Sequence, residues 1–88
     1  DTVRYLVIWN EPNLAFEWGS RSPDPGAYAA LLKVVYPAIK AANPNVQIAA
    51  GGLSPGPSIP NIRMDDRQYL RGMIDAGAPF DVLAIHAY

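Results

Sequence analysis

The sequence predicts an α/β fold in which parallel strands alternate with helices. Three apolar runs rich in β-branched or aromatic residues are typical of strands, at Val3–Trp9, Val46–Gly51 and Asp81–Tyr88. The two segments between these runs carry apolar residues at helical spacing. Strands separated by helical segments imply right-handed crossover connections and a parallel sheet, which is what the order strand, helix, strand, helix, strand predicts.

The first strand changes from apolar to polar within one residue. The run Tyr5–Trp9 predicts a buried strand, and Asn10 and Glu11 follow it directly. Pro12 fixes φ and has no N–H, so the strand cannot continue past Glu11. In α/β proteins ligands bind at the carboxyl ends of parallel strands. We therefore expect Asn10 and Glu11 to lie at the ligand-binding edge of the sheet.

The first helix has clear start and stop signals. Asp24 can cap free N–H groups, Pro25 suits the first helical position, and Asn43-Pro44-Asn45 ends the helix. Pro37 should kink the helix or loosen its last turns. The apolar face expected to pack on the sheet consists of Tyr28, Leu31, Leu32, Val35 and Ile39.

The second helix follows a long loop. Gly51-Gly52 is expected to open this loop, which runs from Leu53 to Met64; it lacks the Gly-Lys-Ser/Thr of a phosphate-binding loop. The helix should begin near Asp65 or Asp66, and Gly77 is suited to close it. Its expected apolar face consists of Tyr69, Leu70, Met73 and Ile74.

Composition excludes several classes of function. The 88 residues carry a net charge of −1, and the seven Lys and Arg are scattered, so nucleic acid is not an expected partner. No apolar run approaches the ~20 residues that span a bilayer, so we expect no membrane partner. One His and no Cys argue against a dedicated metal site, and we expect no cofactor. The localisation stays open.

Two motifs together resemble a known family. Trp9-Asn10-Glu11-Pro12-Asn13 is similar to the acid/base motif of the retaining glycoside hydrolases of clan A, the cellulase and β-xylosidase superfamily built on (β/α)8 (TIM) barrels. In that superfamily Asn-Glu-Pro follows the fourth strand, and His86-Ala87-Tyr88 resembles the His-x-Tyr that closes the sixth. The resemblance implies that residues 1–88 are a βαβαβ segment covering strands 4 to 6 of such a barrel.

The resemblance also implies roles for four residues. Glu11 would be the general acid/base, and Asn10 would hydrogen-bond the sugar 2-hydroxyl. Tyr88 would hydrogen-bond the nucleophile, and His86 would line the same subsite. The implied substrate is an oligo- or polysaccharide, and secretion is what the family commonly shows. For Trp9 we expect packing. Phe16 and Trp18 could stack on sugar rings, but loop aromatics usually fold back onto the barrel rim, and we expect this of both.

The chain departs from the family in one important respect. The family's nucleophile is a glutamate after the seventh strand, and the matched segment ends at the sixth. Among the acidic residues only Glu17 could approach Glu11, from the loop after the same strand. We therefore expect that the isolated chain is inactive and that the nucleophile lies outside it.

Two other interpretations stay open. The chain could belong to a non-catalytic carbohydrate-binding barrel, or it could be a barrel segment that pairs with copies of itself. Two helices would cover only one face of the sheet, and open strand edges favour association. The expected partners are therefore either the remaining barrel strands or further copies of the chain.

Overall fold

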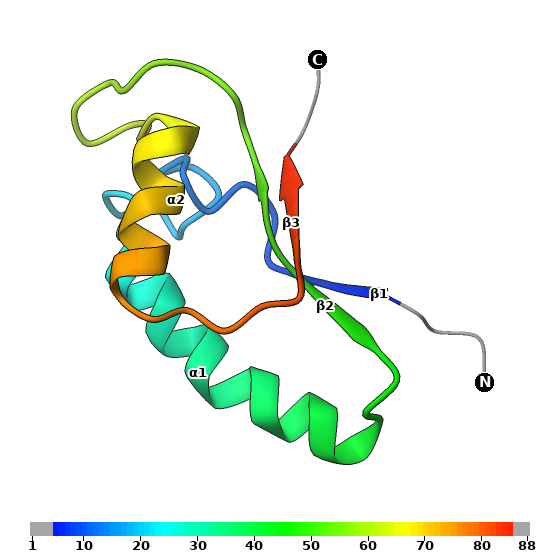
Figure 1. Cartoon of the computed structure of the whole chain (residues 1–88). Helices are drawn as coiled ribbons and strands as arrows, with labels where there is room; N and C mark the ends of the chain where they lie inside the picture. Colours follow the sequence, from blue (N-terminus) through cyan, green and yellow to red (C-terminus); the bar gives the residue numbers. More distant parts are fainter. Residues whose placement is uncertain (1–4, 86–88) are drawn as a thin grey trace.

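A computed structural model describes residues 5–85 as a small α/β unit with a three-stranded parallel sheet and two helices (Figure 1). The strand order is β1-β2-β3, and both neighbouring pairs are parallel, as the sequence predicts. The elements are β1 (Tyr5–Ile8), α1 (Pro25–Ala42), β2 (Gln47–Leu53), α2 (Asp66–Asp75) and β3 (Val82–Ile85).

Both helices lie on the same side of the sheet, and the carboxyl end of β2 leads into the long loop before α2 (Figure 1). Central strand β2 is buried along Ile48–Leu53. The core forms where this strand meets the helices and the loop after β1. Its buried members are Trp18, Tyr28, Leu32, Ala50, Leu53, Tyr69 and Met73.

The start and the end of α1 agree with the sequence. The Asp24 carboxylate accepts a hydrogen bond from the Ala27 N–H at 3.0 Å, and Pro25 is the first helical residue. Tyr28 and Leu32 are buried, so the predicted apolar face is the one that packs. The helix continues past Pro37 to Ala42, so this proline does not end it.

The ends of α2 are also those that the sequence predicts. Asp65 caps the helix by accepting from the N–H groups of Arg67 and Gln68. Gly77 has φ of 77°, a left-handed conformation that suits glycine, and its N–H bonds the carbonyl of Ile74 at 2.9 Å. The prediction for Ile74 is wrong, because this side chain is 58% exposed. It points away from the face by which α2 packs.

The prediction that the first strand is buried is wrong for its described residues. Tyr5 and Val7 are 63% and 53% exposed. Val7, Ala49 and Val82 lie side by side in register, on the face turned away from the helices. Because the helices cover only the opposite face and β1 is an edge strand, an apolar sequence does not suffice to bury it.

The strand ends differ from the predicted ones. β1 stops at Ile8 because Trp9 adopts a positive φ, and Val3 lies outside the described residues. β2 extends to Leu53 and does not open into a loop at Gly51, because Leu53 pairs with Ile85 across a shift in register. The described part of the third strand ends at Ile85.

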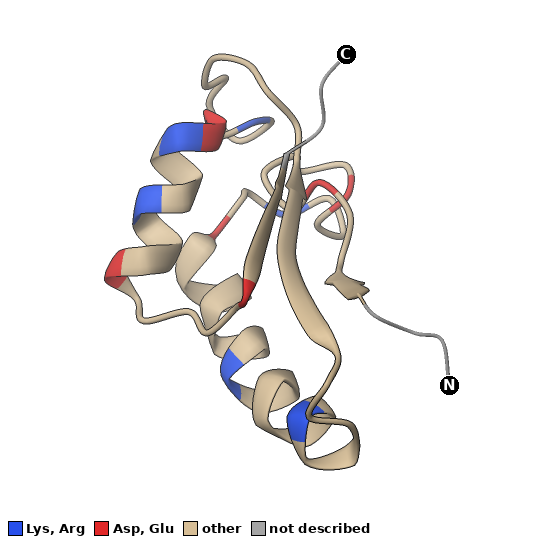
Figure 2. Cartoon of the chain, turned by 45° about the vertical axis from the view of Figure 1, so that its right-hand side comes forward, with Lys and Arg blue, Asp and Glu red and all other residues tan. Residues whose placement is uncertain are grey.

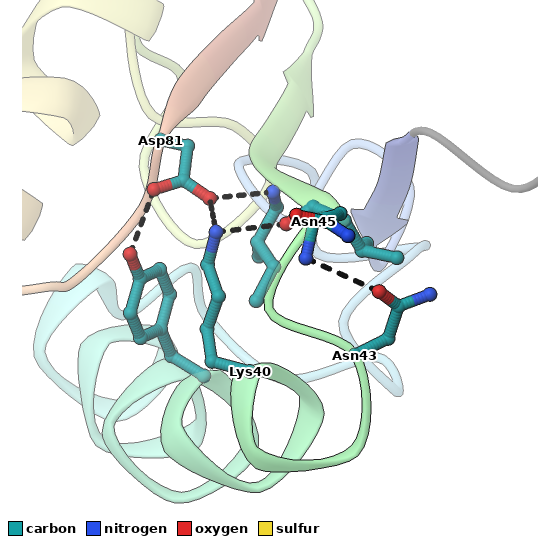
Figure 3. Close-up of polar contacts among 7 residues, drawn as sticks. Lys40, Asn43, Asn45 and Asp81 are labelled. Carbon is teal, nitrogen blue, oxygen red and sulfur yellow. Dashed lines mark hydrogen bonds and ion pairs between the residues drawn. The ribbon is translucent and has the colours of Figure 1, made fainter.

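A polar network fastens the amino end of β3 to α1 and β2 (Figure 3). The Asp81 carboxylate lies 2.7 Å from Lys40 Nζ, and it accepts hydrogen bonds from the Tyr36 hydroxyl at 2.7 Å and the Ile48 N–H at 2.9 Å. Lys40 also donates to the Val46 carbonyl at 2.8 Å. The Lys40 hydrogen bond, followed by those from Ile48 and Tyr36, lowers the pKa of Asp81 to about 2.

This network predicts an acid-dependent loss of stability. Because the pKa of Asp81 is lower in the folded chain than its ordinary value of 3.8, its contribution is present above about pH 5 and disappears as the pH falls towards about 2. Asp81→Asn should lower the free energy of unfolding at neutral pH and flatten its decline in acid. Urea titrations at several pH values measure this, with exposed Asp75→Asn as the control. A wild-type pH slope in Asp81→Asn would contradict the assignment.

Candidate functional site

The turn that follows β1 carries unusual backbone conformations. Trp9 and Glu11 have φ of 71° and 48°, in the left-handed region that non-glycine residues rarely occupy. Each such residue costs about 1–3 kcal/mol and persists only where surrounding contacts hold it. Two of them lie within the segment that sequence analysis selects as the site.

Glu11 is held at the carboxyl end of the central strand. Its N–H donates to the Gly52 carbonyl at 3.1 Å, and its own carbonyl accepts from the Leu14 N–H at 3.0 Å. The residue is 9% exposed. Its backbone is therefore fixed relative to β2.

Asn10 is exposed next to Glu11, and its side chain donates to Glu17 Oε1 at 3.3 Å. Trp9 Nε1 donates to the Glu17 carbonyl oxygen at 2.7 Å. The loop after β1 thus folds back so that Glu17 contacts Asn10. The sequence indicates Glu17 as the acidic residue able to approach the site. In the structure Glu17 contacts Asn10, which precedes Glu11 in the chain.

Asn13 is a residue whose importance sequence analysis missed. It is fully buried, and its amide pairs with the backbone of Ser54 in both directions, at 2.7 Å to the carbonyl and 2.9 Å from the N–H. Its Nδ2 also donates to the Met64 carbonyl at 3.0 Å, and the Met64 N–H donates to the Asn13 carbonyl at 2.9 Å. Asn13 therefore ties the loop carrying Glu11 to both ends of the loop between β2 and α2.

Tyr28, assigned to the helix core by the sequence, also supports the site. Its hydroxyl donates to the Ile8 carbonyl and accepts from the Gly51 N–H at 2.9 Å. It thereby joins β1 to β2 at the point where the chain turns towards Glu11. Burial raises the pKa of Tyr28, and the Gly51 hydrogen bond opposes this. No sequence signal separates this bridging role from simple packing.

Two buried tyrosines allow a matched test. Tyr28→Phe should lower the free energy of unfolding by about 1–3 kcal/mol, because it leaves the Ile8 carbonyl and the Gly51 N–H without this partner. The Tyr69 hydroxyl is buried and has no hydrogen-bond partner within residues 5–85. Tyr69→Phe should therefore leave stability unchanged or raise it. Equal losses for both variants, measured by chemical denaturation, would contradict this account.

Two of the four predicted site residues, His86 and Tyr88, lie outside the described residues. Asn10 and Glu11 do lie at the carboxyl edge of the sheet. Leu53 pairs with Ile85, so the last described residue of β3 lies beside the end of β2 at this same edge. Within residues 5–85 the structure therefore places Glu17 in hydrogen-bond contact with Asn10, the neighbour of Glu11 in the chain.

The loop aromatics take different positions. Trp18 is 6% exposed and packs edge-on against Trp9, with ring centroids 5.0 Å apart. This confirms that Trp18 folds back, whereas Trp9 packs only in part, because it is 47% exposed. Phe16 is 84% exposed, so the expectation that it also returns to the rim is wrong.

Within residues 5–85 no group of three or more His, Cys, Asp or Glu side chains is placed to hold a metal ion. Among the same residues, no helix has the length and apolar character needed to cross a membrane. Comparison with family models, with characterised proteins and with solved structures finds no match to this chain.

Proposed function

We propose that this chain is the βαβαβ segment of a retaining glycosidase barrel and that Glu11 is its general acid/base. The observation that supports this most is the position of Glu11, a largely buried residue fixed at the carboxyl end of the central strand by the Gly52 carbonyl. A strained turn and an adjacent exposed amide accompany it.

The proposed chemistry follows from this placement. A retaining glycosidase needs one carboxyl group that donates a proton to the glycosidic oxygen and then removes one from the attacking water. The acid must hold its proton at the working pH, and it has to sit at a fixed place in the site. Glu11 fits this role, and the exposed amide of Asn10 can hydrogen-bond a sugar hydroxyl beside it.

The second carboxylate is proposed to come from outside the chain. Retaining enzymes hold the nucleophile about 5–5.5 Å from the acid/base. The Glu17 carboxylate accepts a hydrogen bond from Asn10, and Trp9 holds the Glu17 backbone carbonyl, which together suit a supporting role better than attack on a sugar. Tyr88 would then hydrogen-bond the external nucleophile, and His86 would line the same subsite.

Hydrolysis of aryl β-xylosides and β-glucosides by the full-length protein tests this function. The proposal predicts turnover and a first-formed sugar with the anomeric configuration of the substrate, which proton NMR detects. An inverted product would contradict the retaining mechanism. Binding of oligosaccharides without turnover would favour a non-catalytic carbohydrate-binding barrel, for which the same exposed Asn10 is the supporting observation.

We propose that the sheet face opposite the helices is covered by a partner. This partner is either the remaining barrel strands or another copy of the chain. Among residues 5–85 the charged side chains lie on the helices and loops, and none lies within the three strands (Figure 2). Tyr5, Val7 and Val82 expose apolar surface on the face opposite the helices. A face of this kind favours burial against another apolar layer.

The isolated 88-residue chain should therefore associate in solution. Val7→Lys should shift its sedimentation towards the monomer, because it places a charge on the apolar face. Val34→Lys is the matched control, since Val34 is 71% exposed on α1. A monodisperse monomer of the unmodified chain in analytical ultracentrifugation would rule out association through this face.

A further inference from the structure

An open groove of about 400 Å³ lies between the end of the loop after β1 and the loop before α2. Its polar lining residues are Ser22, Ser58, Asn61, Arg63 and Gln68, and its other walls are proline and aliphatic side chains. No acidic side chain lines it. The groove is therefore a concave, amphipathic surface with one positive charge.

The two amides in the groove are oriented as donors. The Ser22 hydroxyl donates to Asn61 Oδ1 at 2.9 Å, and the Ser58 hydroxyl donates to Gln68 Oε1 at 3.1 Å. Each serine thus occupies an amide oxygen and leaves the NH2 group of the same side chain for a ligand.

Asp65 follows the groove residue Met64 in the chain, and its carboxylate is already engaged. Asp65 accepts from the N–H groups of Arg67 and Gln68, at 2.9 and 3.1 Å, and so caps α2. Its own N–H donates to the Ser58 hydroxyl at 2.9 Å. The negative charge is stabilised by the helix N-terminus and is not the natural partner of the groove's guanidinium.

Arg63 supplies a positioned cation. Its guanidinium makes no ion pair or hydrogen bond within residues 5–85. It lies against Gly56, where an added Cβ would come within 2.3 Å of Nη1. Its backbone pairs with Ile59 at 2.8 and 2.9 Å, and the next residue, Met64, is bonded to Asn13. The loop that presents this cation is thereby fastened to the segment carrying Glu11.

We infer that this groove binds the carboxylate of an acidic sugar unit, such as a uronic acid, in an oligosaccharide. The inference rests on the proposed function for the nature of the ligand. A planar guanidinium can hold a carboxylate by two parallel hydrogen bonds, and the two free amide NH2 groups add further donors. The proline and aliphatic walls offer apolar surface to the C–H face of a sugar ring.

The charge of the groove and its hydrogen-bond donors favour an acidic sugar over a neutral one. A neutral unit presents hydroxyl groups that donate as well as accept, whereas the side chains here offer mainly donors. A carboxylate accepts only, and its charge opposes that of Arg63. The arrangement therefore favours an acidic over a neutral oligosaccharide.

The test is a titration of the full-length Glu11→Gln variant, which removes the proposed acid/base so that the ligand is not consumed. Uronic acid-bearing oligosaccharides, neutral xylo-oligosaccharides and sodium acetate are compared by NMR and calorimetry. We expect the acidic oligosaccharide to shift the amide signals of Asn61, Arg63 and Gln68 and to bind about tenfold or more tightly than the neutral one.

Matched variants assign the effect to the groove. Arg63→Gln should lose about tenfold in affinity, and Arg63→Lys should recover only part of it because the forked geometry is gone. Arg71→Gln removes the same charge from the exposed surface of α2 and should bind as the parent does. Preserved amide spectra show that each variant remains folded.

Several outcomes would overturn the inference. They are equal affinity for acidic and neutral oligosaccharides, equal losses in Arg63→Gln and Arg71→Gln, or acetate binding as tightly as the acidic oligosaccharide. If the protein hydrolysed neutral glycosides but bound acidic oligosaccharides no more tightly than neutral ones, the groove assignment would be refuted and the proposed function would stand. Acidic binding in a protein that hydrolyses no glycoside would refute the proposed function and leave the groove assignment standing.

Discussion

Glu11→Gln in the full-length protein should lower kcat/KM for alkyl β-glycosides about 10²–10⁴-fold, because the departing alkoxide needs a proton in the transition state. Dinitrophenyl glycosides should suffer a much smaller loss in the glycosylation step, since their leaving group is stable without protonation. Steady-state kinetics on a series of leaving groups measures this contrast.

Asp75→Asn is the control for this experiment. It also exchanges a carboxylate for an amide, but on the exposed carboxyl end of α2. Its kinetics should match those of the parent protein. A Glu11→Gln variant with an equal loss for every leaving group would show that Glu11 does not act as the proton donor.

Asn13→Ala should lower the free energy of unfolding by about 3 kcal/mol, because it removes three side-chain hydrogen bonds, two of them buried, and leaves a cavity. This is a large part of the ~5–15 kcal/mol typical of a whole domain. Asn13→Asp should be at least as damaging, since a carboxylate would then face the carbonyls of Ser54 and Met64. Urea denaturation followed by tryptophan fluorescence measures both.

Asn45→Ala is the matched control for Asn13, because Asn45 is exposed in the turn before β2. It should change stability by less than about 0.5 kcal/mol. If Asn13→Ala were equally mild, the two loops would not depend on the buried amide, and the placement of Glu11 would need another explanation.

Features set by local chemistry could be predicted from the sequence. Asp24 and Pro25 start α1, Asp65 caps α2 and Gly77 closes it, because each depends on residues within one helical turn. The parallel order of the sheet also follows from the alternation of strands and helices. The placement of Asn10 and Glu11 at the carboxyl edge required only the polar residues after an apolar run.

Features that depend on distant partners could not be predicted. Tyr5 and Val7 look buried in the sequence but are exposed, because burial depends on what covers the second face of the sheet. Asn13 resembles any loop asparagine until the fold brings Ser54 and Met64 to it. The length of β2 likewise depends on its pairing with β3 beyond Gly51.

The most direct test of the central claim is the product that Glu11→Ala forms from a dinitrophenyl β-glycoside in the presence of azide. Without a general base, water attacks the covalent intermediate slowly. Azide needs no deprotonation and can attack the intermediate in place of water. The account predicts faster turnover and a β-glycosyl azide, with the configuration of the substrate retained. An α-glycosyl azide would make Glu11 the nucleophile, and no response to azide would contradict the acid/base assignment.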